Sequence, residues 1–151
     1  MITAASYGPP VTGSGLVTDA PLRILIAEDD EQLADLVESV LDDDARFVLV
    51  ARASDGNEAV RLCAEHEPDI VLMDIGMPGL DGIDATRAIH ARDADQHVVI
   101  YTGSDEYDDV ARADAAGASG FLHKRALTSP DLAEALYVLH TNYANRVPDP
   151  E

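Results

Sequence analysis

The chain is poor in cysteine and in long hydrophobic runs, and each shortage excludes a class of protein. Cys63 is the only cysteine among 151 residues, so no disulfide can form within the chain, and a reducing cytosol suits it. The longest apolar runs, such as residues 70–73, are far shorter than the roughly 20 residues of a membrane-spanning helix. The N-terminus also lacks the basic and apolar segments of a secretory signal. We therefore expect a cytoplasmic protein that is not associated with a membrane.

Basic residues are also scarce. The chain has 10 Lys and Arg against 29 Asp and Glu, which gives a net charge of −19. Binding to a nucleic acid backbone needs clustered Lys and Arg. The best basic cluster here, His123, Lys124 and Arg125, is too small, so this chain alone is not expected to bind nucleic acid. Most of the surface acids are explained by solubility.

Length and composition predict one domain with two flanking segments. A chain of 151 residues that is 46% hydrophobic can bury one core. Residues 1–20 are rich in Gly, Pro, Ser and Thr without apolar periodicity, which predicts a disordered N-terminal extension. Residues 142–151 contain two prolines and end polar, which predicts a flexible tail. The domain is therefore expected to span residues 21–141.

Strand and helix patterns alternate through this domain. Five short, nearly continuous apolar runs predict strands at residues 22–27, 47–51, 70–73, 98–101 and 120–122. Helices are predicted at residues 31–42, 57–65, 81–92 and 105–116, and a fifth helix follows Ser129, which can cap it. Five β-then-α units predict an α/β fold with a doubly wound, five-stranded parallel sheet. In such sheets ligands bind at the carboxyl ends of the strands.

The first predicted helix has the clearest apolar face. The residues at its i, i+3, i+4, i+7 and i+8 positions are Leu33, Leu36, Val37, Val40 and Leu41. Asp30 precedes this helix and is expected to be its N-cap or a first-turn acid. In the fifth helix, Pro130 fits the first turn and Asp131 favours the positive end of the helix dipole.

Polar residues gather at the carboxyl ends of the predicted strands. Glu28 and Asp29 follow the first strand, Asp74 the third, Thr102 the fourth and Lys124 the fifth. Converging carboxylates repel one another and need a cation to stay ionised, and Mg²⁺ suits such oxygen ligands. A lysine binds phosphate oxygens, and an Asp carboxylate can itself accept a phosphoryl group. Taken singly, each has a plainer explanation: a turn acid, a strand-end hydroxyl or a solvated lysine.

The segment that begins at Asp74 reads DIGMPGLDG. It resembles the D-x-x-M-P-x-x-D-G signature of response-regulator receiver domains. Three further segments fall in register: IAEDD at the first strand, YTGS at the fourth and GFLHK at the fifth. The resemblance covers residues 22–141 and implies a flavodoxin-like (βα)5 receiver fold. It implies a switch that takes a phosphoryl group from a histidine kinase or phosphotransfer protein, rather than an enzyme with an external substrate.

The resemblance also implies a role for individual residues. Asp74 matches the phosphoacceptor. Glu28, Asp29, Asp74 and the backbone carbonyl of Gly76 match the groups that hold Mg²⁺, with Glu28 acting largely through water. Lys124 matches the lysine that contacts the phosphoryl oxygens.

Four further positions match the family through switching and loop shape. Thr102 matches the hydroxyl that moves to the phosphoryl group, and Phe121 the aromatic that turns inward with it; a core aromatic alone would indicate packing. Pro78 and Gly82 match the turn that shapes the site, where Gly82 is expected to permit backbone angles that other residues resist.

Two features depart from, or refine, the family pattern. Arg125 follows Lys124 where many members have proline, so a trans peptide bond and a different loop are expected there. Gly76 and Ser104, two positions beyond the acceptor and the switch hydroxyl, are small. We hypothesise that they leave water access to an acyl phosphate.

The sequence indicates less about the output of the switch than about its phosphorylation site. The expected responsive region is the fourth helix, the fifth strand and the fifth helix. Its candidate partner surface, for which a merely solvated face is the alternative, comprises Tyr107, Asp108, Arg112, Asp114 and Tyr137. An unknown downstream protein, or a second copy of the chain in a homodimer, could bind there. The chain could be a stand-alone receiver or the N-terminal receiver piece of a DNA-binding transcription factor.

Two other classes fit less well. Aspartyl-phosphate hydrolases share an Asp nucleophile and Mg²⁺ but need a second acid two residues later, where this chain has Gly76. A flavin-binding module would need a phosphate loop rich in Ser, Thr and Gly after the first strand, and the acids at residues 28–30 would repel phosphate there.

Overall fold

The computed structural model describes residues 20–103 and 107–144. Five strands form one sheet: β1 (Leu22–Ala27), β2 (Phe47–Ala53), β3 (Ile70–Asp74), β4 (His97–Thr102) and β5 (Gly120–His123). The helices are α1 (Glu31–Asp42), α2 (Gly56–His66), α3 (Gly82–Arg92), α4 (Tyr107–Ala115), the 3-10 helix η1 (Lys124–Thr128) and α5 (Leu132–Ala144). All paired strands run parallel, in the order β2-β1-β3-β4-β5. The predicted fold class is confirmed.

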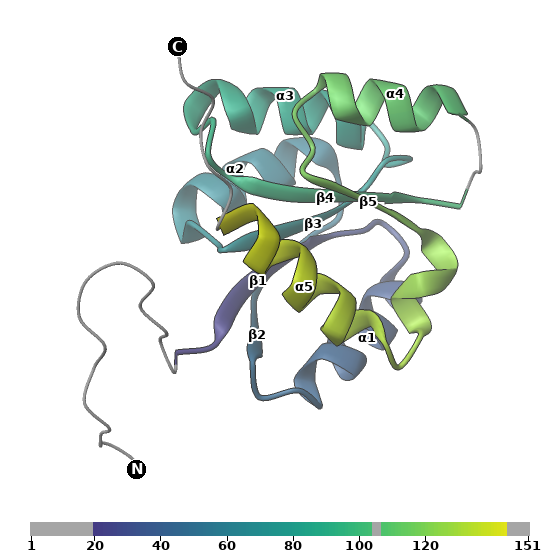
Figure 1. Cartoon of the computed structure of the whole chain (residues 1–151). Coiled ribbons are helices and arrows are strands. Elements are labelled where there is room, and N and C mark those ends of the chain that lie inside the picture. Colours follow the sequence, from purple (N-terminus) through teal and green to yellow (C-terminus); the bar gives the residue numbers. More distant parts are fainter. Residues whose placement is uncertain (1–19, 104–106, 145–151) are drawn as a thin grey trace.

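The sheet lies between two helical layers (Figure 1). One core contains residues of α1 and α5, such as Val37 and Leu136; the other contains residues of α2, α3 and α4, such as Cys63, Ile83 and Ala113. Every residue of β3 and β4 is buried, because helices cover both faces of these central strands. This burial explains why the strands read as apolar runs. Because the strands are parallel, their polar carboxyl ends lie together at one edge of the sheet.

Aspartates at the carboxyl edge begin three of the helices. The Asp30 side chain accepts hydrogen bonds from the N–H groups of Gln32 and Leu33, at 3.0 and 3.3 Å, so its predicted role as an N-cap is confirmed. Asp55 and Asp81 cap α2 and α3 in the same way. Each cap contributes about 1 kcal/mol to helix stability.

The predicted core face of α1 is wrong at one position. Leu36 is 53% exposed, whereas Ala34, Val37 and Leu41 are buried. The buried stripe is therefore rotated toward Ala34, and Leu36 lies at its solvent edge.

The chain after β5, where the sequence predicted a loop of different shape from the family's, folds into a short helix before α5 begins. It forms η1, and the Oγ of Ser129 accepts a hydrogen bond from the N–H of Asp131 at 3.1 Å. Ser129 therefore stabilises a turn, and α5 begins only at Leu132 and runs to Ala144, past the predicted domain end at residue 141. Across the described residues no peptide bond is cis, as expected for Lys124–Arg125.

Three predictions concern segments that the structure does not describe, or describes in part. The N-terminal extension, all but its last residue, and residues 145–151 of the tail lie outside the described residues, as does Ser104. Among the residues described, no helix combines the length and apolar character needed to cross a membrane.

Candidate functional site

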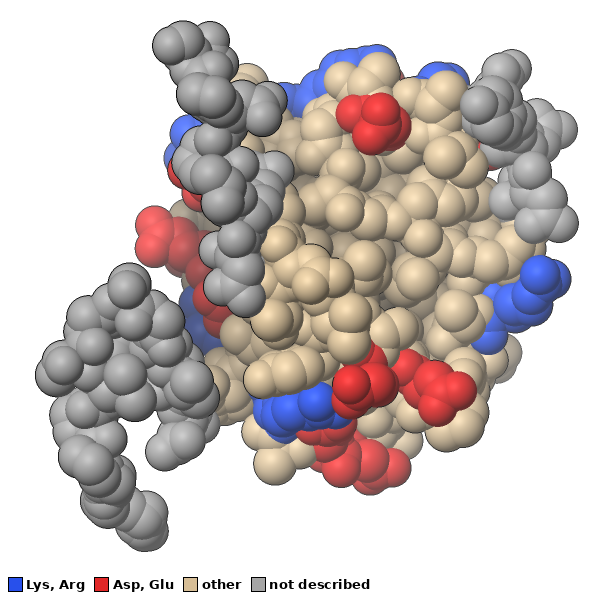
Figure 2. All heavy atoms as spheres, viewed as in Figure 1, with Lys and Arg blue, Asp and Glu red and all other residues tan. Residues whose placement is uncertain are grey.

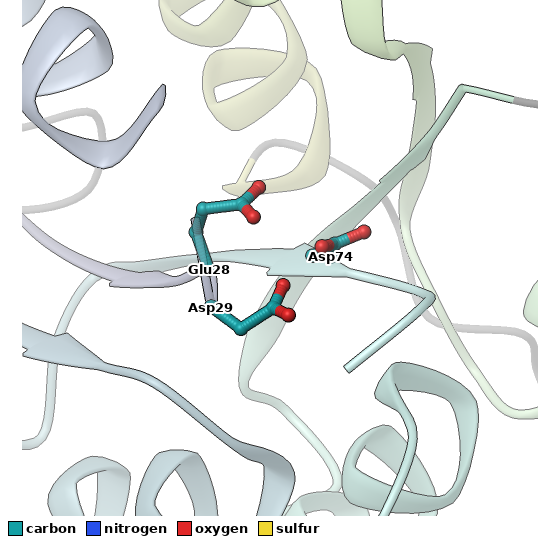
Figure 3. A group of neighbouring side chains, drawn as sticks. All are labelled: Glu28, Asp29 and Asp74. Atoms are coloured by element: carbon teal, nitrogen blue, oxygen red, sulfur yellow. The ribbon is translucent and has the colours of Figure 1, made fainter. Parts of the chain in front are cut away.

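Three carboxylates converge where β1 and β3 end (Figure 3). Neighbouring pairing of these strands, with Ala27 opposite Met73, brings the residues that follow to the same level. One oxygen from each of Glu28, Asp29 and Asp74 can be chosen so that all lie within 4.8 Å of one another. Glu28 and Asp74 are buried, at 3% and 4% exposure, while Asp29 is exposed. The site is therefore half enclosed, with one carboxylate on the solvent side.

Both oxygens of the Glu28 carboxylate have donors. The Tyr101 hydroxyl donates to Oε1 at 2.6 Å, and the backbone N–H of Asp30 donates to Oε2 at 2.9 Å. Hydrogen bonds to an ionised acceptor are short and strong, so these two fix the plane of the carboxylate. Tyr101 is itself fully buried in β4.

Asp74 is held by the loop that follows it. The N–H of Gly76 donates to Oδ1 of Asp74 at 3.2 Å.

Glycine is required in this loop for two different reasons. A Cβ on Gly82 would lie 2.1 Å from the Asp74 carbonyl oxygen, so Gly82 is required because the two backbone segments approach closely. The expected reason, unusual backbone angles, applies instead to Gly79, which has φ 71°. No atom lies within 4 Å of a Cβ built on Gly76, so the space beside that residue is open.

Charge in this site is poorly compensated by the protein. Burial, and then the charge of Asp74, raise the pKa of Glu28, although the hydrogen bonds from Tyr101 and Asp30 oppose this. Burial likewise raises the pKa of Asp74, against the effects of the Gly76 N–H and the Lys124 charge. A cation among the three carboxylates would reverse this penalty. The donor set, carboxylate oxygens with room for water, suits a hard divalent ion such as Mg²⁺.

The remaining predicted residues lie on β4 and β5, beside the carboxylates. Thr102 ends β4, is 4% exposed and pairs with His123 of β5. Lys124 follows directly, and its Cδ lies 3.7 Å from the position of a Cβ on Gly103. Its charge acts on both Glu28 and Asp74. The carboxylates, hydroxyl and lysine expected from sequence therefore share one edge of the sheet.

Phe121 lies further back on β5. It is half-buried opposite Ile100 and packs against the core on the α4 side. It also lines a cavity of about 180 Å³ together with residues of α4, among them Val110 and Ala113. The ring therefore borders free space next to α4.

Sequence reasoning missed Tyr101. The segment YTGS drew attention to Thr102 alone, and the tyrosine before it was treated as part of an apolar strand. A polar-tipped aromatic one position before the end of a buried strand is the signal that could have found it.

Comparison with known proteins shows which family has this arrangement of residues. The family model for the response regulator receiver domain matches residues 24–137. The chain belongs to this family. It is 33% identical over 114 residues to the chemotaxis protein CheY of Halobacterium salinarum, covering 76% of this chain and 92% of that protein. It is 40% identical over 116 residues to the transcriptional regulatory protein PdtaR of Mycobacterium tuberculosis, covering 74% of this chain.

Solved receiver structures agree with this assignment. The receiver domain of the response regulator NarL from Mycobacterium tuberculosis superposes with a TM-score of 0.75 at 27% identity, covering 80% of this chain and 97% of that one. A LuxR-family two-component response regulator from Aurantimonas gives a TM-score of 0.73 at 33% identity, covering 83% and 87%. The match spans 92% of the length of this CheY but only 55% of the length of PdtaR, so the relatives include both a protein that the receiver fills almost entirely and a longer one. The protein is thus a receiver domain of two-component signalling.

Proposed function

We propose that this receiver accepts a phosphoryl group on Asp74, in a Mg²⁺-dependent reaction, from a histidine kinase or a phosphotransfer protein. The observation that carries the proposal is the cluster of Glu28, Asp29 and Asp74 within 4.8 Å, two of them buried, beside the charge of Lys124. Buried carboxylates with raised pKa values are costly to a fold, and the charge of Lys124 offsets only part of this cost. Such a cost is understandable where a divalent ion and a phosphoryl group complete the charge balance.

The chemistry follows from these positions. An oxygen of Asp74 attacks the phosphorus of the donor phosphohistidine, the P–N bond breaks, and its electron pair leaves on the imidazole, which takes up a proton. When bound, Mg²⁺ neutralises charge on the phosphoryl oxygens. Asp29 and Asp74 would bind the ion directly, the Gly76 carbonyl would add a ligand, and Glu28 would accept a hydrogen bond from a metal-bound water. Lys124 would pair with another phosphoryl oxygen.

The added charge would then rearrange the neighbouring strands. Thr102 would donate to a phosphoryl oxygen, and Phe121 would turn into space vacated beside β4, altering its contact with α4. The Arg112 guanidinium of α4 lies 3.6 Å from the Asp81 carboxylate that caps α3, in the loop that follows Asp74. This contact offers a second path from the phosphorylated loop to α4. Equal amide exchange in α4 before and after phosphorylation would contradict the switch.

The partner surface is expected over α4, β5 and α5. Charged side chains lie mainly around the rim of this face, although the whole chain is strongly acidic (Figure 2). Val110 and Val138 are exposed there, at 40% and 46%. Asp114 and Arg112 are exposed on α4, whereas Tyr137 lies under the guanidinium of Arg46, 4.4 Å from its ring centre, which places it toward the loop after α1. The side chains of Tyr107 and Asp108 lie outside the described part of the chain.

A second candidate concerns the output. Curated relatives such as PdtaR are named as transcriptional regulators, and the chain matches about half their length. The receiver could accordingly act as the N-terminal piece of a transcription factor, or alone through protein contacts or a homodimer. The length of the encoded protein would separate these two forms. Hydrolysis of an external substrate is not favoured, because Gly76 offers no acid–base side chain at the position where phosphohydrolases use one.

The proposal is tested by incubating the full chain with phosphoramidate, with and without Mg²⁺, and measuring its intact mass. We expect one Mg²⁺-dependent phosphoryl adduct, absent from Asp74→Asn. Asp84→Asn, an exposed carboxylate on α3, is the matched control and should accept the adduct like wild type. An adduct that persists in Asp74→Asn, or none in folded wild type, would contradict the proposal.

A further inference from the structure

A buried phenol reaches the acidic cluster from a strand that is not adjacent to β1. The sheet order places β3 between β1 and β4, and Tyr101 of β4 pairs in register with Asp74 of β3. Its hydroxyl nevertheless lies 2.6 Å from Oε1 of Glu28 and 3.3 Å from the carbonyl oxygen of Ala27, both at the end of β1. The side chain therefore passes across the end of β3, next to the proposed phosphoacceptor.

The position of the ring is fixed by packing. Tyr101 is fully buried and belongs to the core cluster on the α1 and α5 side, with Leu127 of η1 and Leu132 of α5. The backbone around it is also fixed, because its carbonyl accepts a hydrogen bond from the Ile75 N–H at 3.0 Å. A hydroxyl on a ring packed in the core is a donor of defined position, and a hydrogen bond to it restrains the rotation of the Glu28 carboxylate.

We propose that Tyr101 is a positioning residue that sets the affinity of the receiver for Mg²⁺ by orienting Glu28. This inference rests on the proposed function. With Oε1 on Tyr101 and Oε2 on the Asp30 N–H, the carboxylate plane is set, and the remaining lone pairs are available to a metal-bound water between Glu28, Asp29 and Asp74. Outer partners of this kind affect metal affinity by about ten- to hundredfold, because they remove the need to order the ligand upon binding.

Phenylalanine at position 101 provides the test, because it removes the hydroxyl and keeps the ring that fills the core. Mg²⁺ binding to the full chain is measured by isothermal titration calorimetry. For Tyr101→Phe we expect the Kd for Mg²⁺ to rise about tenfold or more. The rate of phosphorylation by phosphoramidate should recover toward the wild-type rate when Mg²⁺ is raised to saturation. A loss of rate that saturating Mg²⁺ does not restore would contradict a role through metal affinity.

Tyr143 provides a matched control. Its hydroxyl also donates one hydrogen bond, at 2.7 Å to the carbonyl oxygen of Asp95, but before β4 begins, at the opposite edge of the sheet. Tyr143→Phe should leave the Kd for Mg²⁺ unchanged. An equal rise in Kd in both variants would mean that any lost tyrosine hydroxyl loosens the domain, and would overturn the inference.

A double-mutant cycle with Glu28→Gln tests whether Tyr101 acts through that carboxylate. In the Glu28→Gln background, adding Tyr101→Phe should weaken Mg²⁺ binding less than twofold, because the carboxylate that Tyr101 orients is already absent. The full tenfold effect in both backgrounds would overturn the inference.

A spectroscopic readout needs no change at position 101. Mg²⁺ added to wild type should give a tyrosine ultraviolet difference spectrum, because the hydrogen bond to Glu28 is altered, and Glu28→Gln should not give it. The same spectrum in Glu28→Gln, or none in wild type despite Mg²⁺ binding, would overturn the inference while leaving the proposed function intact. Wild type that neither binds Mg²⁺ nor forms the Asp74 adduct would overturn both.

Discussion

Buried polar groups have different surroundings at the two edges of the sheet. At the amino edge, the Gln96 side-chain amide donates to the carbonyl oxygens of Pro68 and His97, at 3.0 and 3.3 Å, and its oxygen faces the Cys63 thiol at 3.6 Å. At the carboxyl edge, Glu28 and Asp74 lie equally buried, yet burial raises the pKa of each. Gln96 therefore has partners within the protein for both ends of its amide, whereas the carboxyl edge keeps like charges together.

This difference separates stability from function within one small domain. The buried Gln96 amide strengthens the link between α2, the segment before β3 and the start of β4. Buried carboxylates without a cation weaken the fold, and the proposed metal ion and phosphoryl group would offset this cost. The burial of Cys63 fits the first class, because burial raises the pKa of its thiol to about 11 and so makes it unreactive.

The largest effect should come from adding a side chain at Gly82, where the backbone of Asp74 lies too close for one. Gly82→Ala would place a methyl group 2.1 Å from the Asp74 carbonyl oxygen, so the loop must move. We expect a loss of about 3 kcal/mol in the free energy of unfolding, and slower phosphorylation because the acceptor is displaced. Gly76→Ala is the control, since no atom lies within 4 Å of its Cβ position. Urea denaturation of both variants measures the difference, and equal stabilities would contradict the packing account.

The amino edge should respond to loss of its amide. Gln96→Ala leaves the carbonyls of Pro68 and His97 without this donor, and we expect the free energy of unfolding to fall by about 1–3 kcal/mol. Phosphorylation of Asp74 should continue at the wild-type rate. Gln32→Ala, at an exposed position on α1, is the control and should change stability little. Loss of phosphorylation in a folded Gln96 variant would mean that the two edges are not independent.

Charge removal at the carboxyl edge should act in the other direction. In the absence of divalent ions, Asp74→Asn removes one of two neighbouring buried carboxylates. We therefore expect the free energy of unfolding to rise, on the order of 1 kcal/mol. Added Mg²⁺ should stabilise wild type and have a much smaller effect on Asp74→Asn. Thermal unfolding with and without Mg²⁺ measures both, and a variant less stable than metal-free wild type would contradict the repulsion described here.

The same carboxylates predict a pH dependence. Their ordinary pKa values are 4.5 for Glu28 and 3.8 for Asp74, and both are raised in the folded state. Between the ordinary and the raised values the folded state binds more protons than the unfolded state, so the contribution of these groups to stability falls as pH rises. Without Mg²⁺, this loss should appear as pH rises above about 4, and Mg²⁺ should abolish it. A pH profile identical in wild type and Asp74→Asn would exclude this source.

The smallest expected effect concerns the lifetime of the acyl phosphate. The open space beside Gly76 would admit a water molecule to the phosphoryl group. Gly76→Gln should cover it and slow dephosphorylation several-fold, with little change in stability. The decay of the intact-mass adduct after removal of the donor measures this. An unchanged decay would show that access beside residue 76 does not limit hydrolysis.

Much of the fold was predictable because it depends on local pattern. Strands such as β3 read as aliphatic runs because both their faces are buried, and Asp30 precedes α1 as an N-cap should. Leu36 was misplaced because helical spacing defines a stripe but not which edge of the stripe the sheet covers. The turn at Ser129 was likewise beyond local pattern, because η1 sets where α5 begins.

The candidate site was predictable in its residues but not in its supports. Asp74 and Lys124 stand at strand ends in the sequence, so a parallel sheet must bring them to one edge. The role of Gly82 depends on an approach to the backbone of Asp74 that no spacing reveals. Tyr101 and Glu28 are 73 positions apart, and their contact depends on the order of strands in the sheet.

The central claim is that Asp74 itself forms an acyl phosphate when Mg²⁺ is present. The most direct test is to react the wild-type chain with phosphoramidate, reduce it with borohydride, and map its peptides by mass spectrometry. We predict homoserine in place of Asp74 when Mg²⁺ is present and unmodified Asp74 when it is removed by chelation. Reduction at another carboxylate, or at Asp74 regardless of Mg²⁺, would contradict the account.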